Sequence, residues 1–153
     1  ELPPTLGATF NFIRMTTNAG NTKFLVYMDA NLAFGLFTRR VNGDASSTTP
    51  LVFTDCVVVT RYVVIASVDY ATGAGVVSVN GDTTGLGATG TFGWVAGATC
   101  EALDAGAHIL GQGSAGANPC TLATFGEHIC WNRALTAAER TLINTYLMGK
   151  WRI

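Results

Sequence analysis

The chain has 153 residues, of which 12% are charged, against about 25% in an ordinary soluble domain. Nine Lys and Arg offset ten Asp and Glu, so the net charge is −1, and the mean hydropathy is +0.32. Without a Lys/Arg cluster, this balance excludes the electrostatic footprint of a nucleic-acid-binding protein. Abundant Val, Ile, Leu and Phe exclude disorder, and no apolar run is long enough to span a bilayer. We expect a single globular domain over residues 1–153, without membrane insertion.

Strand patterns recur along the chain, separated by turn clusters. Alternating or continuous β-branched and aromatic residues predict strands at residues 9–17, 23–28, 32–40, 51–60, 62–70 and 76–79. Asn80-Gly81-Asp82 is typical of a hairpin turn. Between residues 83 and 106 the pattern weakens to Gly, Ala and Thr, and two last strands are predicted at residues 108–110 and 124–131.

One helix is predicted near the end of the chain. Thr136 and Glu139 form a capping box, in which each side chain satisfies a free backbone N–H at the helix start. Gly149 stands where a glycine just past the last turn would end the helix. An apolar stripe suited to packing on a sheet lies between them: Leu142, Ile143, Tyr146 and Leu147. Many short strands and one terminal helix predict an all-β, two-sheet antiparallel jelly-roll sandwich with one short C-terminal helix.

The last predicted strand and helix carry a family resemblance. The stretch FGEHICWNRALTAAER (residues 125–140), closing on YLMGKW (residues 146–151), resembles the end of laminin-G-like, concanavalin A-like lectin and glucanase domains of bacterial and phage proteins. VVIASVDY (residues 63–70) is similar to part of their central hairpin, and HILG (residues 108–111) to one of their strands. The resemblance implies a two-sheet jelly roll and a role in carbohydrate binding, adhesion or virion structure. A fold does not fix a function, so the site residues are weighed separately.

Glycan cleavage is the weakest of the functional alternatives. A glucanase needs two carboxylates that flank the glycosidic bond, one as acid and one as nucleophile. Enzymes of the family that this chain resembles carry them on one strand face as E-x-D-x-E or E-x-D-x-x-E, and no stretch of this chain matches either pattern. Glu127 has no acidic residue within ten positions on either side. We interpret it as an anchor for backbone or for Arg133, and no catalytic residue is predicted.

No cofactor or metal site is predicted. GQGSAG (residues 111–116) matches the dinucleotide fingerprint, but the ANPC that follows cannot open the helix that this mechanism needs, so a loop is favoured. Neither His108 nor His128 has a partner at metal-ligand spacing. Calcium, which loop acids hold in many members of the resembling family, stays an open alternative. The loop and turn acids and amides available for it are Asp29, Asn42, Asp44, Asp69 and Asp82.

The chain contains four cysteines. Cys100 and Cys120 flank a Gly/Ala-rich excursion, and we hypothesise a disulfide between them. It would close a loop of about 20 residues and stabilise the fold by on the order of 3 kcal/mol. Cys56 and Cys130 fall in predicted strands, where we interpret them as buried free thiols.

Ligand contact, if the chain binds glycans, is predicted at one strand end and at a Gly-flanked tryptophan. Sugars stack on aromatic faces and exchange hydrogen bonds with planar polar groups. The candidates are Trp94, Arg39, Arg40, Asn42 and Asp44. The alternative for Trp94 is that its ring fills the core or a contact between subunits.

The low charge favours association over isolation in water. Two-sheet folds leave edge strands, which Lys or Glu usually guard, and few such guards are visible. We therefore expect a non-catalytic structural or adhesion module of a virion or cell surface, such as a phage decoration, fibre or tail component. Its expected partners are other protein chains, with a homo-oligomer favoured. The alternative is a lectin-like module that binds surface glycans. The expected location is the virion or the extracellular surface.

Overall fold

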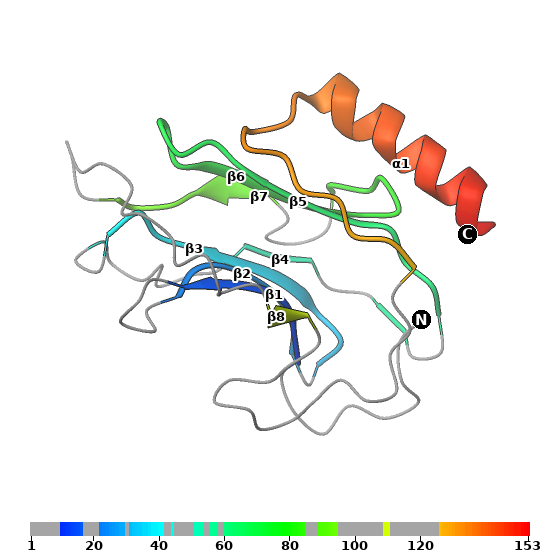
Figure 1. The fold of residues 1–153 in the computed structure, drawn as a ribbon, viewed down its shortest axis with the longest axis horizontal. Helices are drawn as coiled ribbons and strands as arrows, with labels where there is room; N and C mark the ends of the chain where they lie inside the picture. The colour runs from blue at the N-terminus through cyan, green and yellow to red at the C-terminus, as the bar shows by residue number, and fades with distance from the viewer. Residues whose placement is uncertain are drawn as a thin grey trace.

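Two antiparallel sheets and one helix make up the computed structural model of the chain (Figure 1). The structure describes residues 10–16, 22–29, 31–41, 44, 51–53, 56–57, 60–84, 89–94, 109–110 and 126–153. The elements in chain order are β1 (Phe10–Thr16), β2 (Thr22–Met28), β3 (Phe34–Thr38), β4 (Leu51–Phe53), β5 (Val64–Val68), β6 (Ala74–Val79), β7 (Thr89–Thr91), β8 (Ile109–Leu110) and α1 (Ala137–Trp151). One sheet has the order β4-β3-β2-β1-β8 and the other the order β5-β6-β7.

The main core lies between the two sheets. Successive side chains of a strand point to opposite faces, so each strand sends alternate residues into this layer. Met28 of β2, Leu36 of β3 and Val77 of β6 are completely buried there. The cluster also contains Val26, Phe34, Phe53, Cys56, Val68, Val79 and Phe92. This burial from both sheets makes the two layers one structural unit.

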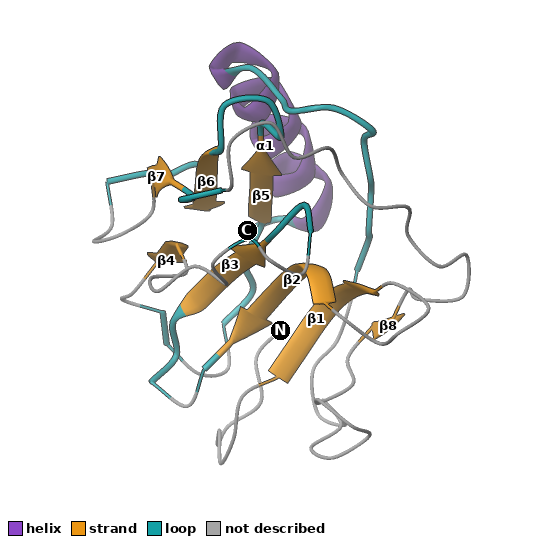
Figure 2. Ribbon diagram, turned by 90° about the vertical axis from the view of Figure 1, so that its left-hand side faces the viewer, coloured by secondary structure: helices purple, strands orange, loops and turns teal. Residues whose placement is uncertain are grey.

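The helix forms a third layer on the outer side of the three-stranded sheet, and Figure 2 shows the helix, that sheet and the five-stranded sheet in succession. The strand β5 and the residue before it supply Val63 and Ile65 to a second apolar cluster with Leu135. Helix residues and the chain end that pack against it are Ile143, Leu147, Met148 and Ile153. The strand β5 is therefore apolar on both faces. Within the described residues it pairs only with β6, and it carries no charged side chain.

Local signals account for the hairpin between β5 and β6 and for the turn after it. Asp69 accepts hydrogen bonds from the backbone of Ala71 and the hydroxyl of Thr72, which shapes the turn. Asn80 and Gly81 both have positive φ, at 53° and 84°, as the predicted hairpin-type turn requires. A Cβ on Gly81 would lie 2.8 Å from Nδ2 of Asn144, so this turn also lies against α1.

Most of the predicted strands are confirmed, together with the helix start. The strands β1, β3, β5 and β8 fall inside predicted segments, while β2 begins one residue and β6 two residues before the segments predicted for them. The strand predicted at residues 51–60 is wrong in extent, because of its described residues, 51–53, 56–57 and 60, only 51–53 form a strand. The strand predicted at 124–131 is wrong over its described part, residues 126–131, which make no strand pairing. The three residues of β7 were not expected; their Gly and Thr content gives little strand signal.

The helix end also differs from the prediction. Gly149 lies inside α1, which continues to Trp151, and Arg152 adopts the left-handed conformation that ends the helix, with φ 54° and ψ 51°. The backbone N–H of Arg152 donates to the carbonyl of Met148. An arginine, not a glycine, occupies the left-handed position here. The prediction that the helix ends at Gly149 is therefore wrong.

Candidate functional site

Three of the predicted ligand-binding residues meet at the end of β3. The carboxylate of Asp44, with a fully buried side chain, accepts hydrogen bonds from the backbone N–H groups of Arg40, at 2.8 Å, and Val41, at 3.2 Å. It also forms an ion pair with Nε of Arg40 at 3.5 Å. Because Asp44 holds both the backbone and the side chain of Arg40, it fixes the direction of the guanidinium.

The guanidinium of Arg40 lies over the ring of Trp94, 4.8 Å from its centroid. The same ring stacks on Tyr70, at 5.2 Å and 16°, and on Phe92, at 5.9 Å and 11°. The Tyr70 hydroxyl is in turn 2.6 Å from the hydroxyl of Thr38. Three neighbours of its own chain thus contact the Trp94 ring, whose Nε1 is buried without a hydrogen-bond partner among the described residues. This arrangement favours a packing role for Trp94 over an open platform for a sugar ring.

The other two predicted ligand residues do not join this cluster in the described structure. Arg39 donates from Nε to the carbonyl of Thr22 at 2.8 Å, and its guanidinium lies over Phe37. Phe37 is paired with Leu25 across β2 and β3. Asn42 lies outside the described residues.

Every carboxylate with a resolved pKa shift is held in its charged form. A hydrogen bond and an ion pair with Lys150, at 2.9 Å, lower the pKa of Glu127. Hydrogen bonds from the Thr72 side chain lower the pKa of Asp69, and hydrogen bonds from Thr84 lower that of Asp82. The prediction of Arg133 as a partner of Glu127 is wrong, because Arg133 pairs with Glu139 and the side chain of Lys150, at the end of α1, binds Glu127.

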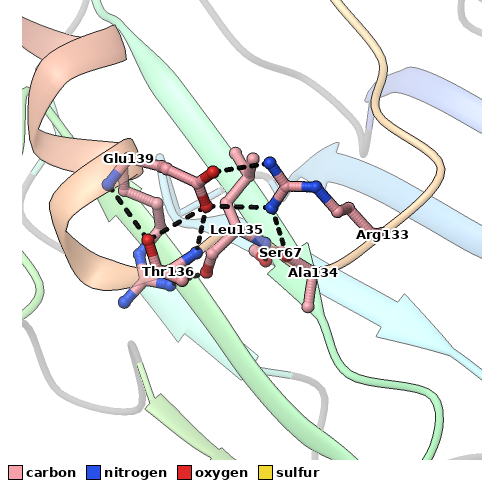
Figure 3. A network of polar contacts seen from close by, with 7 residues as sticks. Ser67, Arg133, Ala134, Leu135, Thr136 and Glu139 are labelled. Atoms are coloured by element: carbon pink, nitrogen blue, oxygen red, sulfur yellow. Dashed lines mark hydrogen bonds and ion pairs between the residues drawn. The ribbon is translucent and has the colours of Figure 1, made fainter.

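Arg133 has a different carboxylate partner, which Figure 3 shows at the start of α1. Its Nη1 donates to Oε2 of Glu139 at 2.9 Å, while the capping box with Thr136 is complete. The hydrogen bond from Arg133 is the largest of the effects that lower the pKa of Glu139 to about 2. The backbone N–H of Leu135 donates to the Ser67 hydroxyl of β5, at 3.0 Å, so this network also ties the helix entry to the sheet.

A cavity of about 950 Å³ opens between the five-stranded sheet, β5 and residues 126–135. Two carboxylates, Asp69 and Glu127, are among its described lining residues. A glycosidase acid needs a raised pKa, whereas the pKa of each of these groups is lowered. Neither carboxylate therefore shows the raised pKa of a glycosidase acid.

The acids considered for calcium are separated into local turns. Asp29 accepts from the backbone N–H groups of Asn31 and Ala33 through Oδ1, at 2.8 and 3.0 Å. Asp44, Asp69 and Asp82 are each bound within their own segments. In the part of the chain that the structure describes, no group of three or more His, Cys, Asp or Glu could hold a metal ion.

One close pair escaped the sequence analysis. Nε2 of His128 lies 3.2 Å from Sγ of Cys130, and both residues are exposed. The interpretation of Cys130 as a buried thiol is wrong, whereas Cys56 is buried as expected. The signal was present, because residues two apart on an extended segment point to the same side. Partial desolvation raises the pKa of the Cys130 thiol, opposite to the shift of an activated nucleophile. Cys100 and Cys120 lie outside the described residues.

One arc of the exposed surface of α1 consists of uncharged residues, and the exposed Lys150 borders it, with its Nζ 5.6 Å from the centroid of the Tyr146 ring. Six exposed residues fall within about 140° of the helix circumference, at about 100° per residue. They form what we call the outer face of α1: Ala138, Thr141, Leu142, Thr145, Tyr146 and Gly149. Leu142 is 70% exposed and Tyr146 57% exposed.

The polar groups of this face are turned inward. The hydroxyl of Thr141 donates to the carbonyl of Ala137 at 3.1 Å, and that of Thr145 to the carbonyl of Thr141 at 2.9 Å. Such bonds satisfy each threonine hydroxyl within the helix. The neighbouring charges are paired as well, since Glu139 binds Arg133 and Lys150 binds Glu127. The face therefore combines apolar side chains with threonine hydroxyls bonded within the helix, and the Lys150 ammonium lies beside Tyr146 at its edge.

Comparison with known proteins gave no relatives. No protein-family model, curated protein or solved structure matches the chain. Among the described residues, no helix is both long and apolar enough to cross a membrane.

Proposed function

We propose that this chain is a non-catalytic structural or adhesion module that assembles with copies of itself through the outer face of α1. The observation that carries the proposal is the exposure of Leu142 and Tyr146 on one uncharged arc of α1, which Lys150 borders. Isolated exposed apolar side chains are common, but a contiguous apolar face on a monomer marks an interaction surface. The net charge of −1 leaves little repulsion between copies.

A second copy is the occupant that the order of residues along the face favours. Small residues stand at both ends, Ala138 and Gly149, and large ones in the middle, Leu142 and Tyr146. This small–large–large–small order reads nearly the same in both directions. A two-fold interface needs such self-complementarity, because the same patch faces itself in reverse. In an antiparallel pairing, Leu142 of one copy would lie near Tyr146 of the other.

The same pairing would explain why a glycine stands at position 149 inside α1. A glycine inside a helix costs about 0.5–1 kcal/mol relative to Ala. A Cβ built on Gly149 meets no atom of the described residues within 4 Å, so no contact among them requires the missing side chain. Close approach of a partner helix would require it.

We further propose that the two sheets belong to a jelly roll of the laminin-G-like, concanavalin A-like kind, and that the module works on a virion or an extracellular surface. The facing antiparallel sheets, the terminal helix and the resemblance of residues 125–151 support this proposal. Glycan binding stays an alternative prediction.

The test introduces one charge into the face. Leu142→Glu keeps a good helix former at an exposed position, so α1 should persist. Val57→Glu is the matched control, because Val57 is 56% exposed and lies outside α1. Sedimentation equilibrium should show self-association of the wild type and the control and its loss in Leu142→Glu. Equal association of all three proteins, or a wild type that stays monomeric throughout, would overturn the proposal.

A further inference from the structure

A small cavity lies where the start of α1 meets the outer side of the three-stranded sheet. Its volume is about 130 Å³. A water molecule takes up roughly 30 Å³ in the liquid, so the cavity has room for a polar group several times the size of water. Its described lining comes from β6, the segment after β6 and the first turns of α1, and contains no carboxylate: Ser78, Gly81, Thr83, Ala137, Arg140 and Thr141.

The hydroxyl of Ser78 points into this cavity. Its neighbours in β6, Val77 and Val79, belong to the core between the sheets, so Ser78 projects to the opposite face, where α1 lies. Ser78 is 2% exposed and lines the cavity, and its hydroxyl has no hydrogen-bond partner among the described residues. Buried polar groups in proteins are hydrogen-bonded as a rule. A polar ligand in the cavity would supply the bond that Ser78 lacks.

Arg140 brings a positive charge to the same cavity. Its Nη1 donates to the carbonyl of Leu135 at 2.6 Å, and the guanidinium carries further N–H donors. No carboxylate among the described residues forms an ion pair with it. The carboxylate of Asp82, which stands between two lining residues, accepts from the backbone N–H and the hydroxyl of Thr84, both at 2.7 Å. The charge beside the cavity is therefore positive, and a guanidinium binds the oxygens of phosphate and sulfate well.

The start of α1 favours an anion at this place as well. Ala137, the first residue of this 15-residue helix, lines the cavity. The first N–H groups of a helix and its dipole attract negative charge. Glu139, the acid of the first turn, lies about 200° around the helix from Ala137, at about 100° per residue. Its carboxylate is bound by Thr136 and Arg133, away from the cavity.

We propose that this cavity binds a tetrahedral oxyanion, phosphate or sulfate, between Ser78, Arg140 and the first turn of α1. The ion would accept hydrogen bonds from the Ser78 hydroxyl and the guanidinium, and no covalent step is involved. The buried hydroxyl of Ser78 distinguishes this helix start from an ordinary one. The site goes beyond the proposed assembly, because it uses the side of α1 that lies on the sheet.

The experiment titrates sodium phosphate into the isotope-labelled full chain and follows the backbone amide signals by NMR, with sodium chloride at equal ionic strength as the blank. The signals of Ser78, Ala137 and Arg140 should shift and saturate with one ion per chain, and sodium sulfate should shift the same signals. O-phospho-L-serine distinguishes two sources of the ligand. Binding like that of phosphate would show that the site accepts the terminal phosphate of a larger molecule, and weaker binding would show that it takes the free ion.

Two variants test the residues that hold the ion. Ser78→Ala and Arg140→Gln should each weaken phosphate binding about tenfold or more, because each removes a hydrogen bond to a charged group. The matched control is Arg152→Gln, which removes the same charge from an exposed position at the other end of α1 and should bind like the wild type. Circular dichroism checks each fold. Ser78→Ala leaves the bond between Arg140 and Leu135 in place, so it carries the test if Arg140→Gln does not fold.

Three results would overturn the proposal: no saturation with phosphate, equal shifts with chloride, or wild-type affinity in a folded Ser78→Ala or Arg140→Gln variant. Leu142→Gln separates this proposal from the proposed function. It removes the exposed apolar side chain of the outer face without adding charge, so it should weaken association and leave phosphate binding unchanged.

Discussion

Replacement of Gly149 by Ala should change folding and association in opposite directions. Gly149 is exposed, lies inside α1, and has open space where a Cβ would be placed. The new methyl group therefore creates no clash with the described residues. It removes the conformational freedom that glycine gives the unfolded chain, which makes the helix more favourable.

The expected gain in the free energy of unfolding of the isolated chain is about 0.5–1 kcal/mol. For a domain of this length, 1 kcal/mol raises the Tm by about 2–4 °C, so a rise of about 1–4 °C is predicted. If Gly149 lies in a helix–helix contact, the same methyl group separates the two helices and weakens self-association. A variant that is more stable but associates more weakly would indicate that the glycine serves the contact with a partner helix.

Urea unfolding at a protein concentration well below the dissociation constant of self-association measures the stability of the single chain. Sedimentation equilibrium measures the self-association. The matched control is Gly81→Ala, since Gly81 has φ +84° and a Cβ there would lie 2.8 Å from Asn144. This control should destabilise the chain. If Gly149→Ala lowers the free energy of unfolding, the interpretation that position 149 of α1 tolerates a side chain is refuted. Unchanged or stronger association would refute the role of Gly149 in the contact.

Three further predictions concern the core, the Trp94 cluster and the helix start. Leu36→Ala should lower the free energy of unfolding by about 2–5 kcal/mol in a urea titration, because Leu36 is fully buried. Trp94→Ala should lower it by about 2–3 kcal/mol, less than for a fully buried ring; a variant of unchanged stability that loses binding on a glycan array would instead support the lectin alternative. The lowered pKa of Glu139 means that its stabilising effect is present above pH 4.5 and is lost as the pH falls toward about 2. Glu139→Gln, which keeps a capping side chain, should therefore flatten the pH dependence of thermal unfolding in that range, and an unchanged acid profile would contradict this.

Local signals explain why much of the fold could be predicted. The Thr136–Glu139 capping box and the Asn80–Gly81 turn depend on residues close in sequence, so their patterns need no tertiary information. Gly149 shows the limit of such signals. A glycine inside the last helical turn and one just beyond it look alike in sequence, and here Arg152 takes the left-handed position.

The candidate sites needed the tertiary structure. Arg40 and Asp44 are close in sequence, but their contact with Trp94 depends on how the ends of β3 and β7 meet. The partner of Glu127 is Lys150, 23 residues away at the end of α1, and no spacing rule identifies that pair. The His-x-Cys spacing at His128 was readable once the segment was taken as extended.

The most direct test of assembly through α1 is a cross-link between unlike positions of two copies. In a background with Cys130→Ser, one chain carries Leu142→Cys and the other Tyr146→Cys. The antiparallel pairing predicts a disulfide between the two different chains on mild oxidation, formed faster than either like pair, since only close Cα atoms can be bridged. The yield is measured by mass spectrometry of the mixed and separate proteins. No preferential disulfide in the mixture would contradict assembly through the outer face of α1.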